Sequence, residues 1–372
     1  MIEFNREELL DLWGVVEAVA PTRSPKEVLT CALLSVAADV VAVRASNLEQ
    51  FVQAELRPER SDDHPPFLLP IGRLGAIMRA NEADTVKITP GQKVHKIAVG
   101  RSRYEVGVVD PNLFPSAESP KMDAVAHVPS SHRLADAISA TSWACDAASS
   151  RYAMGGVQLR AFDDALLLLD GTDGRRLARA RVAFDSRTGK QLAAIIPQGA
   201  CRQWMRLCRR AADGVAIVQW GEQSAMLEIP SAGVRCVTRI VEGRFPRVDD
   251  IVLGDSDQIA EHDRAALIAA LRAAGVSCSN DARGAVMTWG SEIDGGLLRI
   301  EAGSADGGQG VAECEAAVSR EHRAKLDVQF LLDWLQSVSG ERVELRGKGP
   351  DDLVRLSCGA DRAYYLMPMA EG

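Results

Sequence analysis

Apolar residues recur at intervals of three and four in six segments of the chain, a spacing that places them on one face of an α-helix. The segments are residues 5–20, 69–80, 130–147, 196–210, 263–275 and 326–336. Pro70, Pro197 and Asp327 stand at matching places near the start of three of them. The first turn of a helix accepts Pro, whose missing N–H has no partner there, and Asp, which can cap the N–H groups that remain. The pattern therefore predicts six helices in three equivalent pairs.

Between the two helices of each pair, the pattern changes to that of a hairpin. Residues 40–56, 166–184 and 286–302 each carry apolar or alternating residues on both sides of a cluster of Asn, Asp or Gly. This is the local chemistry of two antiparallel strands joined by a turn. More alternation follows the second helix of each pair. The sequence predicts an α+β fold of three tandem repeats, each with two helices packed on antiparallel sheet.

A large apolar residue followed by proline ends the last strand of each repeat. These steps are Phe114-Pro115, Phe245-Pro246 and Met367-Pro368, at the near-equal intervals of 131 and 122 residues. The segments after the first two steps are polar and rich in turn residues, as domain boundaries are. We therefore divide the chain into three domains at residues 1–123, 124–250 and 251–372, each of ordinary domain size.

Composition and motifs narrow the possible functions. The net charge is −8 with 47% hydrophobic residues, which is typical of a globular protein and still allows a local basic patch that binds nucleic acid. The chain has neither an apolar run of the roughly 20 residues that span a membrane nor a signal peptide, so we expect it in the cytoplasm. Eight cysteines without a C-x-x-C pair and six histidines without metal-ligand spacing predict no metal and no cofactor. Because no nucleotide-binding or hydrolase motif occurs, we expect no catalysis.

Short strings in a fixed order relate the chain to a known family. They are ASNLE (45–49), GRSRY (100–104), RYAMGG (151–156), TDGRRLA (172–178), VEGRFP (241–246) and YYLMPM (364–369). Together with the three repeats, they resemble the β sliding clamp of bacterial DNA polymerase III over almost the whole chain. The resemblance implies a homodimeric, head-to-tail ring that encircles duplex DNA without reading its sequence. It also implies DNA polymerase, the clamp loader and repair proteins as partners, which are held through short peptides.

The resemblance and the charge pattern give candidates for the DNA channel and for the subunit joint. The channel candidates are Arg23, Arg73, Arg79, Arg202, Arg206, Arg209 and Arg210. The last four lie at helical spacings of three, four and seven, close to one face, where they would attract phosphates without reading bases. At the subunit joint, we expect Tyr104 and Val106 of the first repeat to meet Leu267 and Leu271 of the third repeat.

The resemblance further implies a pocket between the second and third repeats that takes partner peptides. Its residues would be Met154, Thr172, Gly174, Arg175, Arg176, Leu177, Pro246, Ile251, Tyr365, Leu366, Met367, Pro368 and Met369. Methionines suit such a pocket because they can repack around different peptides. Asp250 and the ending Ala370-Glu371-Gly372 stand where the family commonly has basic residues, so we expect acidic peptides to be disfavoured.

Two other hypotheses stay open. A divergent paralogue could keep the fold and the peptide pocket and act as an adaptor or decoy without encircling DNA. Few basic residues on the inner face would favour it, and the N-terminal helix carries Glu7, Glu8 and Asp11. The other hypothesis is an enzyme with an unrecognised site, which a compact cluster of buried carboxylates or histidines in one cleft would favour.

Overall fold

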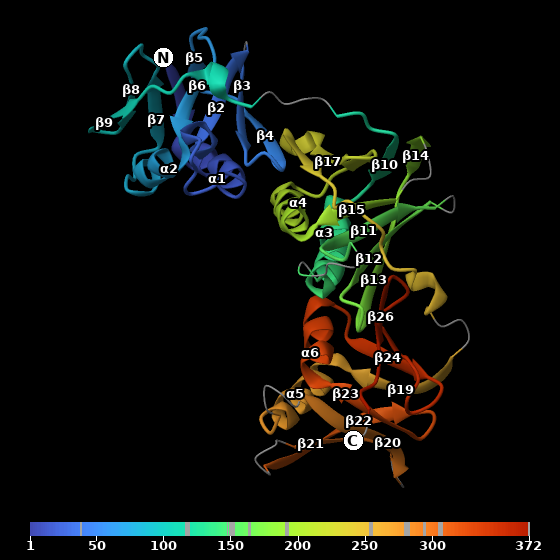
Figure 1. The fold of residues 1–372 in the computed structure, drawn as a ribbon. Helices are drawn as coiled ribbons and strands as arrows, with labels where there is room; N and C mark the ends of the chain where they lie inside the picture. Colours follow the sequence, from blue (N-terminus) through green and yellow to red (C-terminus); the bar gives the residue numbers. More distant parts are fainter. Residues whose placement is uncertain are drawn as a thin grey trace. The chain divides into compact units, whose positions relative to one another are not determined.

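The computed structural model describes the chain except for short stretches. These are residues 38, 116–119, 147, 149–152, 163, 164, 190–192, 253–255, 279–282, 293, 294, 304–307, 371 and 372. The described residues, drawn in Figure 1, divide into two compact units. Unit 1 consists of residues 1–135 and 184–240, and unit 2 consists of residues 136–183 and 241–372.

Unit 1 contains the first repeat and much of the second. Its helices are α1 (Arg6–Glu17), α2 (Ile71–Arg79) and α4 (Gln198–Arg210), and α3 (Ser131–Thr141) begins in it. Its strands are β1 (Ile2–Asn5), β2 (Cys31–Ala37), β3 (Val40–Ser46), β4 (Gln50–Leu56), β5 (Arg60–Ser61), β6 (Phe67–Pro70), β7 (Thr85–Thr89), β8 (Val94–Val99), β9 (Ser102–Gly107), β10 (Ala124–Val128), β14 (Ser186–Gly189), β15 (Ala193–Pro197), β16 (Ala216–Trp220), β17 (Ser224–Ile229) and β18 (Val234–Arg239).

Unit 2 contains the rest of the second repeat and the third. Its helices are α5 (Arg264–Gly275) and α6 (Val328–Ser337), with a short 3-10 helix η5 (Val248–Asp250) before them. Its strands are β11 (Gly156–Ala161), β12 (Leu166–Thr172), β13 (Arg176–Ala183), β19 (Asp257–Asp263), β20 (Gly284–Glu292), β21 (Gly295–Gly303), β22 (Gln309–Val318), β23 (His322–Asp327), β24 (Arg342–Gly347), β25 (Val354–Ser357) and β26 (Arg362–Leu366).

The same order of elements occurs three times along the chain. A strand and a helix (β1 and α1, β10 and α3, β19 and α5) are followed by further strands, a second helix (α2, α4, α6) and three last strands. Pro70, Pro197 and Asp327 are the N-cap residues of the second helices, one position before the helices begin. Among the described residues, the predicted six helices and the fold of three tandem α+β repeats are confirmed. The exact division at residues 123 and 250 stays a prediction.

The strands pair antiparallel within each unit. In unit 1, one sheet has the order β5-β1-β7-β8-β9 and a second has the order β14-β10-β16-β17-β18-β4-β3-β2-β6. In unit 2, the order is β11-β12-β13-β26-β25-β24-β19-β22-β21-β20-β23. The last strand of the second repeat, β18, therefore pairs with β4 of the first repeat. In the same way β26, the last strand of the third repeat, pairs with β13 of the second.

The helices of unit 1 are tied to one another by side-chain hydrogen bonds to backbone carbonyls. Asn5 caps α1 by accepting from the N–H groups of the first turn. Trp13 of α1 is buried and its Nε1 donates to the carbonyl of Ile71 at 2.8 Å. Gln203 of α4 donates through Nε2 to the carbonyl of Val15 at 3.0 Å. These bonds hold α1 beside α2 and α4 in one helical layer (Figure 1).

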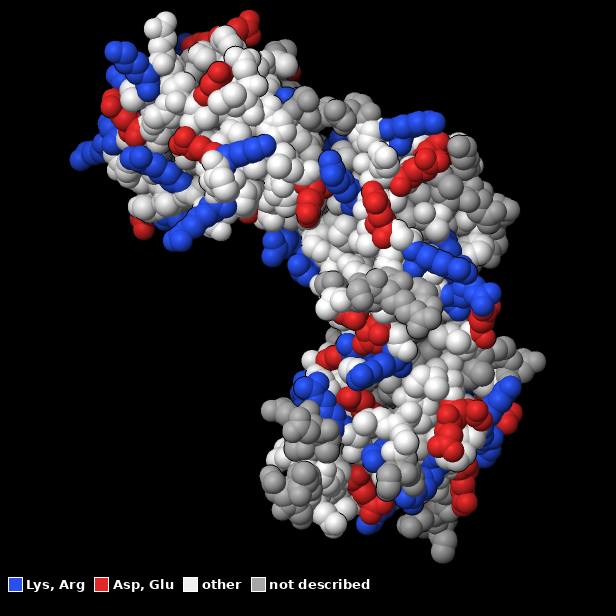
Figure 2. All heavy atoms as spheres, in the orientation of Figure 1, with Lys and Arg blue, Asp and Glu red and all other residues white. Residues whose placement is uncertain are grey.

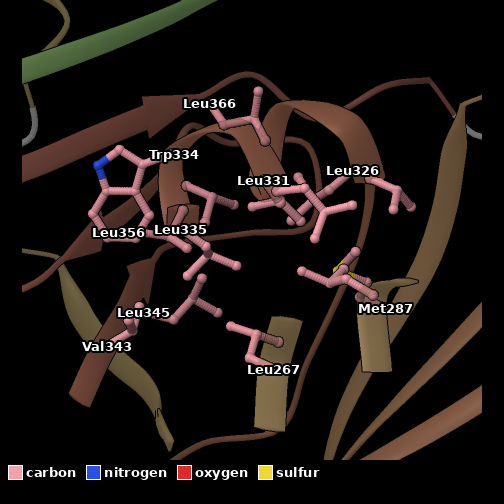
Figure 3. Close-up of a cluster of buried hydrophobic side chains, with 14 of the residues drawn as sticks. Leu267, Met287, Leu326, Leu331, Trp334, Leu335, Val343, Leu345, Leu356 and Leu366 are labelled. Carbon is pink, nitrogen blue, oxygen red and sulfur yellow. The ribbon is translucent and has the colours of Figure 1, made fainter. Parts of the chain in front are cut away.

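The core of unit 2 gathers apolar side chains from α5, α6 and the strands beneath them (Figure 3). Leu267 and Leu271 of α5 belong to this core, with 5% and 0% of their surface exposed. They point inward because apolar residues four apart share the helix face that packs on the sheet. The prediction that these two leucines contact a second subunit is therefore wrong. Ile268, which lies between them in the sequence, is only partly buried.

Candidate functional site

The hairpin formed by β12 and β13 carries five of the predicted peptide-site residues in or beside its turn. Asp173 accepts hydrogen bonds from the backbone N–H groups of Arg175 and Arg176, at 3.0 and 3.1 Å. Thr172 is buried and its hydroxyl donates to the carbonyl of Arg176 at 2.6 Å. Gly174 has a φ of +87°, a conformation that costs other residues strain and costs glycine little. The local sequence thus fixes a tight hairpin that ends beside β26.

Arg176 is held on all sides rather than directed toward solvent. Its guanidinium donates to Asp173 and to Asp333 of α6, both at 2.8 Å. The guanidinium carbon also lies 4.8 Å from the ring centre of Trp143 and 4.0 Å from that of Phe330. Two carboxylates and two ring faces leave the side chain 11% exposed. Arg176 therefore anchors the hairpin to α6.

The end of the chain divides into a buried part and an exposed part. Tyr365 and Leu366 are 3% and 1% exposed and pair with Leu177 and Arg176 across β26 and β13. Met367 and Met369 are 50% and 38% exposed. They do not fray, because the N–H of Met367 donates to the carbonyl of Arg175 at 3.3 Å and that of Met369 to Lys325 at 2.8 Å. The two exposed methionines are thus presented on an ordered segment.

The segment around the second proline step reaches the same hairpin through an ionic network. Asp249 of η5 accepts hydrogen bonds from Arg160 and Arg179, with that from Arg179 at 2.7 Å. Both arginines also donate to Asp170, which is fully buried. These hydrogen bonds, first that from Arg160, hold the pKa of Asp249 well below its usual range. Ile251, just after η5, is 49% exposed.

Met154 lies beside the same hairpin. The carbonyl of Arg244 accepts from the N–H of Ala153 at 3.1 Å, which ties the 153–154 segment to the chain before Pro246. The methyl of Met154 lies 3.9 Å from where a Cβ on Gly174 would stand. Four segments that are distant in the sequence therefore meet in unit 2. The sequence did not indicate Trp143, Phe330 or Asp333, since only the fold brings them to Arg176.

Among the predicted peptide-site residues, the exposed apolar ones are Ile251, Met367 and Met369. Leu177, Tyr365 and Leu366 are core residues of the sheet, and Met154 is 8% exposed. Gly174 and Arg175 are exposed, and Pro246 and Pro368 are partly buried. The peptide pocket itself stays a prediction.

The predicted DNA-contacting arginines lie on the helical layer of unit 1 or in the loop after α1. Arg23, Arg73, Arg202, Arg206 and Arg209 are exposed. Two others are paired with acidic residues of α1, Arg79 with Glu17 and Arg210 with Asp11, the latter at 2.6 Å. Figure 2 shows blue side chains over the region of α1, α2 and α4, with red ones among them. The positive charge of this layer is therefore partly offset.

Strand β9 lies at the edge of its sheet and pairs with β8. Tyr104 on β9 is partly buried, and its hydroxyl accepts from the side-chain N–H of Asn81 at 3.0 Å. Val106 is 1% exposed, so its side chain belongs to the core of unit 1 and the prediction that it contacts a second subunit is wrong. In unit 2, β22 pairs with β21 at residues 309–316 and with β19 at Ala317 and Val318.

Membrane-spanning helices and metal sites are both missing from the described part of the chain. No helix there is both long and apolar enough to cross a membrane. No group of three His, Cys, Asp or Glu side chains in that part is placed to hold a metal ion.

Comparisons with known proteins agree with these features. Residues 129–247 match the family model of the DNA polymerase III beta subunit, central domain. The β sliding clamps of Pseudomonas putida and Pseudomonas aeruginosa are each 24% identical to the chain, and the alignments cover 98% of both sequences. The crystal structure of a P. aeruginosa sliding clamp bound to griselimycin superposes with a TM-score of 0.91 over 99% of both chains at 22% identity. The DNA polymerase III β subunit of Thermotoga maritima gives 0.87 at 16% identity, covering 100% of this chain and 99% of that one. The chain thus has the fold of the bacterial β sliding clamps and is similar to them in sequence over nearly its whole length, and its residues 129–247 match the central domain of the DNA polymerase III β subunit.

Proposed function

We propose that the chain is a DNA sliding clamp that forms a homodimeric ring around duplex DNA. In this role it tethers the replicative polymerase, the clamp loader and repair proteins through short peptides and does no chemistry of its own. The name of its relatives supports the general function. The pattern of strand pairing within the chain supports the ring.

The last strand of a repeat pairs with an earlier strand of another repeat twice within the chain. Strand β18 pairs with β4, and β26 pairs with β13. In the described structure, the equivalent strand of the first repeat, β9, has β8 as its partner and one open edge. The equivalent of β4 and β13 in the third repeat is β22, whose residues 309–316 pair with β21. A second copy placed head to tail would let β9 pair with β22, which closes a ring of six repeats after two chains.

One pair of opposite charges is available to such a joint. Arg103 on β9 and Glu315 on β22 are both exposed, whereas Glu313 already pairs with Arg299 at 3.0 Å and Glu105 on β9 carries the same charge as Glu315. Opposite charges on neighbouring strands add to the backbone pairing, each by about 0.2–1 kcal/mol. The joint would replace the contact first expected from Val106, Leu267 and Leu271, whose side chains are already in the two cores.

The exposed arginines of α2 and α4 support a DNA-facing role for the helical layer. Arg73, Arg202 and Arg206 would contact phosphates, which carry no sequence information and so permit sliding. Pairing of Arg79 and Arg210 with α1 carboxylates weakens the positive field. That pairing is also the observation that favours the second candidate function, a peptide-binding adaptor that does not encircle DNA.

Retention on circular DNA tests the ring. With the clamp loader of the same organism and ATP, the chain should stay on a primed circular plasmid through gel filtration and should leave when the plasmid is cut once. Equal retention on circular and cut DNA would show ordinary surface binding. No retention on either, together with intact peptide binding, would favour the adaptor.

A triple variant locates the DNA-binding surface. Arg202→Ala, Arg206→Ala and Arg209→Ala together should reduce retention on every sequence and lower the slope of log K against log salt by roughly 0.9 for each phosphate that is no longer neutralised. The matched control replaces Arg57, Arg60 and Arg235, three arginines exposed on or beside the strands of unit 1, and should retain DNA as the unchanged chain does.

A further inference from the structure

A hollow of about 660 Å³ opens in unit 2 beside the end of β26. Its lining comes from residues 320–323, Lys325, residues 348–351, Met369 and Ala370. These residues belong to the turn before β23, to β23 itself, to the loop after β24 and to the chain end. Met369 is also one of the exposed apolar residues that we assign to the peptide site. The hollow is therefore continuous with that site at its C-terminal end.

The charges that line the hollow are mainly positive. Arg320, Arg323, Lys325 and Lys348 are basic, and Glu321 and Asp351 are acidic, although the chain as a whole has a net charge of −8. Arg320 is fixed by donating to the carbonyls of Gly347 and Lys348 at 3.0 and 2.9 Å and to Asp257 at 3.1 Å. A local excess of positive charge in a concave site attracts anions in particular.

Two more contacts indicate a built site rather than a chance cluster. The ammonium of Lys325 donates to the carbonyl of Ala370 at 3.3 Å, which keeps its charge at the mouth beside Met369. His322 is 8% exposed and lines the hollow, and among the described atoms its Nε2 has no hydrogen-bond partner.

We propose that this basic hollow binds carboxylate side chains that flank the apolar segment of a partner peptide. The proposal rests on the peptide-binding role proposed above and adds to it a preference for acidic flanks. A peptide whose apolar residues lie on Met367 and Met369 would place its next residues against Lys325 and Lys348. Charge-assisted hydrogen bonds from ammonium groups to carboxylates are roughly twice as strong as neutral ones.

This preference runs against the expectation from Asp250 and the acidic chain end. Asp250 pairs with Arg247 at 3.4 Å, and its side chain is 63% exposed, so solvent screens its repulsion. Residue 371 lies outside the described residues. The hollow gathers four basic groups, of which Arg323 and Lys348 are also exposed, against the single carboxylate of Asp250. We therefore expect the attraction to exceed the repulsion for acidic residues placed at that end of the peptide.

The test uses an apolar peptide selected against the intact chain from a displayed random library. It is synthesised with three Glu or three Gln at one end and then at the other, and binding is measured by calorimetry at low and high salt. With Glu at the end that reaches the hollow, affinity should be about tenfold higher than with Gln, equivalent to about 1.4 kcal/mol. That gain should fall at high salt, because exposed charges are screened.

Charge variants then test whether the basic residues of the hollow cause this gain in affinity. Lys325→Gln with Lys348→Gln should abolish the gain, measured as the ratio of the affinities for the Glu and Gln peptides. Lys325→Glu with Lys348→Glu should reverse the preference, so that a peptide flanked by Lys binds more tightly than one flanked by Glu. If the two lysines had only a structural role, the preference would not reverse. The matched control, Arg272→Gln with Arg342→Gln, removes two exposed charges elsewhere in unit 2 and should keep the gain.

Three outcomes would overturn the proposal, and they are distinguishable. Equal binding of Glu and Gln peptides by the unchanged chain would leave the apolar site intact and remove the role of the hollow. Failure to select any peptide would overturn the peptide-binding function as well. Binding of a short single-stranded oligonucleotide or inorganic phosphate that the Lys variants abolish, without any Glu preference, would make the hollow a phosphate site.

Discussion

Arg160, Asp170, Arg179 and Asp249 form an ionic network that includes η5, the segment just before Ile251 of the proposed peptide site. Asp170 is fully buried, yet both of its oxygens accept hydrogen bonds from guanidinium groups. Removing one member of such a network costs more than the pair contributes, because a buried charge is left alone. The network therefore fixes the position of η5 and, with it, of Pro246 and Ile251.

Asp249→Asn tests that role. The substitution should lower the free energy of unfolding at pH 7 by about 1 kcal/mol, less than the roughly 1.5–3 kcal/mol of a buried charged hydrogen bond, because the Asp249 side chain is 56% exposed. Thermal unfolding followed by circular dichroism should show a decrease of about 2–3 °C.

The direction of this pKa shift determines how the stabilising effect of Asp249 changes with pH. The pKa of Asp249 is lowered in the folded chain, so its stabilising effect is complete above the unfolded pKa of about 4 and is lost as the pH falls below that value. The difference in the free energy of unfolding between the Asp249→Asn variant and the unchanged chain should therefore become smaller toward a pH of about 3. Asp250→Asn, the exposed neighbour, should change little at either pH. A difference that is constant with pH would mean that the carboxylate charge is not involved.

At the level of elements, the helices and hairpins follow from local sequence. Amphipathic spacing and cap residues such as Asp327, whose carboxylate accepts from the N–H of Phe330, specify a helix without reference to the rest of the chain. Local sequence does not specify in the same way whether a single residue lies in the core or at a contact surface. Leu267 and Leu271 were expected at the surface, but only the packing of α5 on its sheet decides which apolar face is covered. The basic hollow was not predicted, since residues 320–325 and 348–351 are brought together by β23 and β24.

The end of β26 marks which residues of the proposed peptide site can be deleted without unfolding the chain. Tyr365 and Leu366 are sheet core residues, whereas residues 367–372 follow the last strand. Deletion of residues 367–372 should reduce the affinity for an apolar partner peptide by at least about thirtyfold, since a central anchor contributes about 2 kcal/mol. The melting temperature and the dimer should be retained.

Calorimetric titration of the full and truncated chains measures the loss. The control is Met369→Leu, which keeps an apolar side chain of similar size and should bind nearly as well. Unchanged affinity after the deletion would place the peptide site elsewhere. A lowered melting temperature would instead show that the last six residues stabilise unit 2 directly.

At the level of the whole molecule, the open edge of β9 is the feature that requires a partner. An unpaired strand edge exposes a row of N–H and C=O groups that other chains can pair with, and a closed ring removes it. The N–H of Val108 donates to the carbonyl of Lys93, so alternate residues Val106 and Tyr104 direct their N–H groups toward β8. Arg103 and Glu105 then direct theirs toward the open edge.

Glu105→Pro should therefore break the dimer and keep the fold. Proline removes the outward N–H and places its ring at the edge, while the pairing of β9 with β8 uses the N–H groups of the neighbouring residues. Light scattering after gel filtration should show a monomer at micromolar concentration, where we expect the unchanged chain to be a dimer, and the dissociation constant should rise by at least about tenfold. Glu105→Ala keeps the N–H and should stay dimeric.

Because ring closure precedes retention, the Pro variant should also fail to remain on circular DNA while still binding the peptide, whose proposed site lies in unit 2. A Pro variant that is folded, dimeric and retained on DNA would place the subunit joint at another surface.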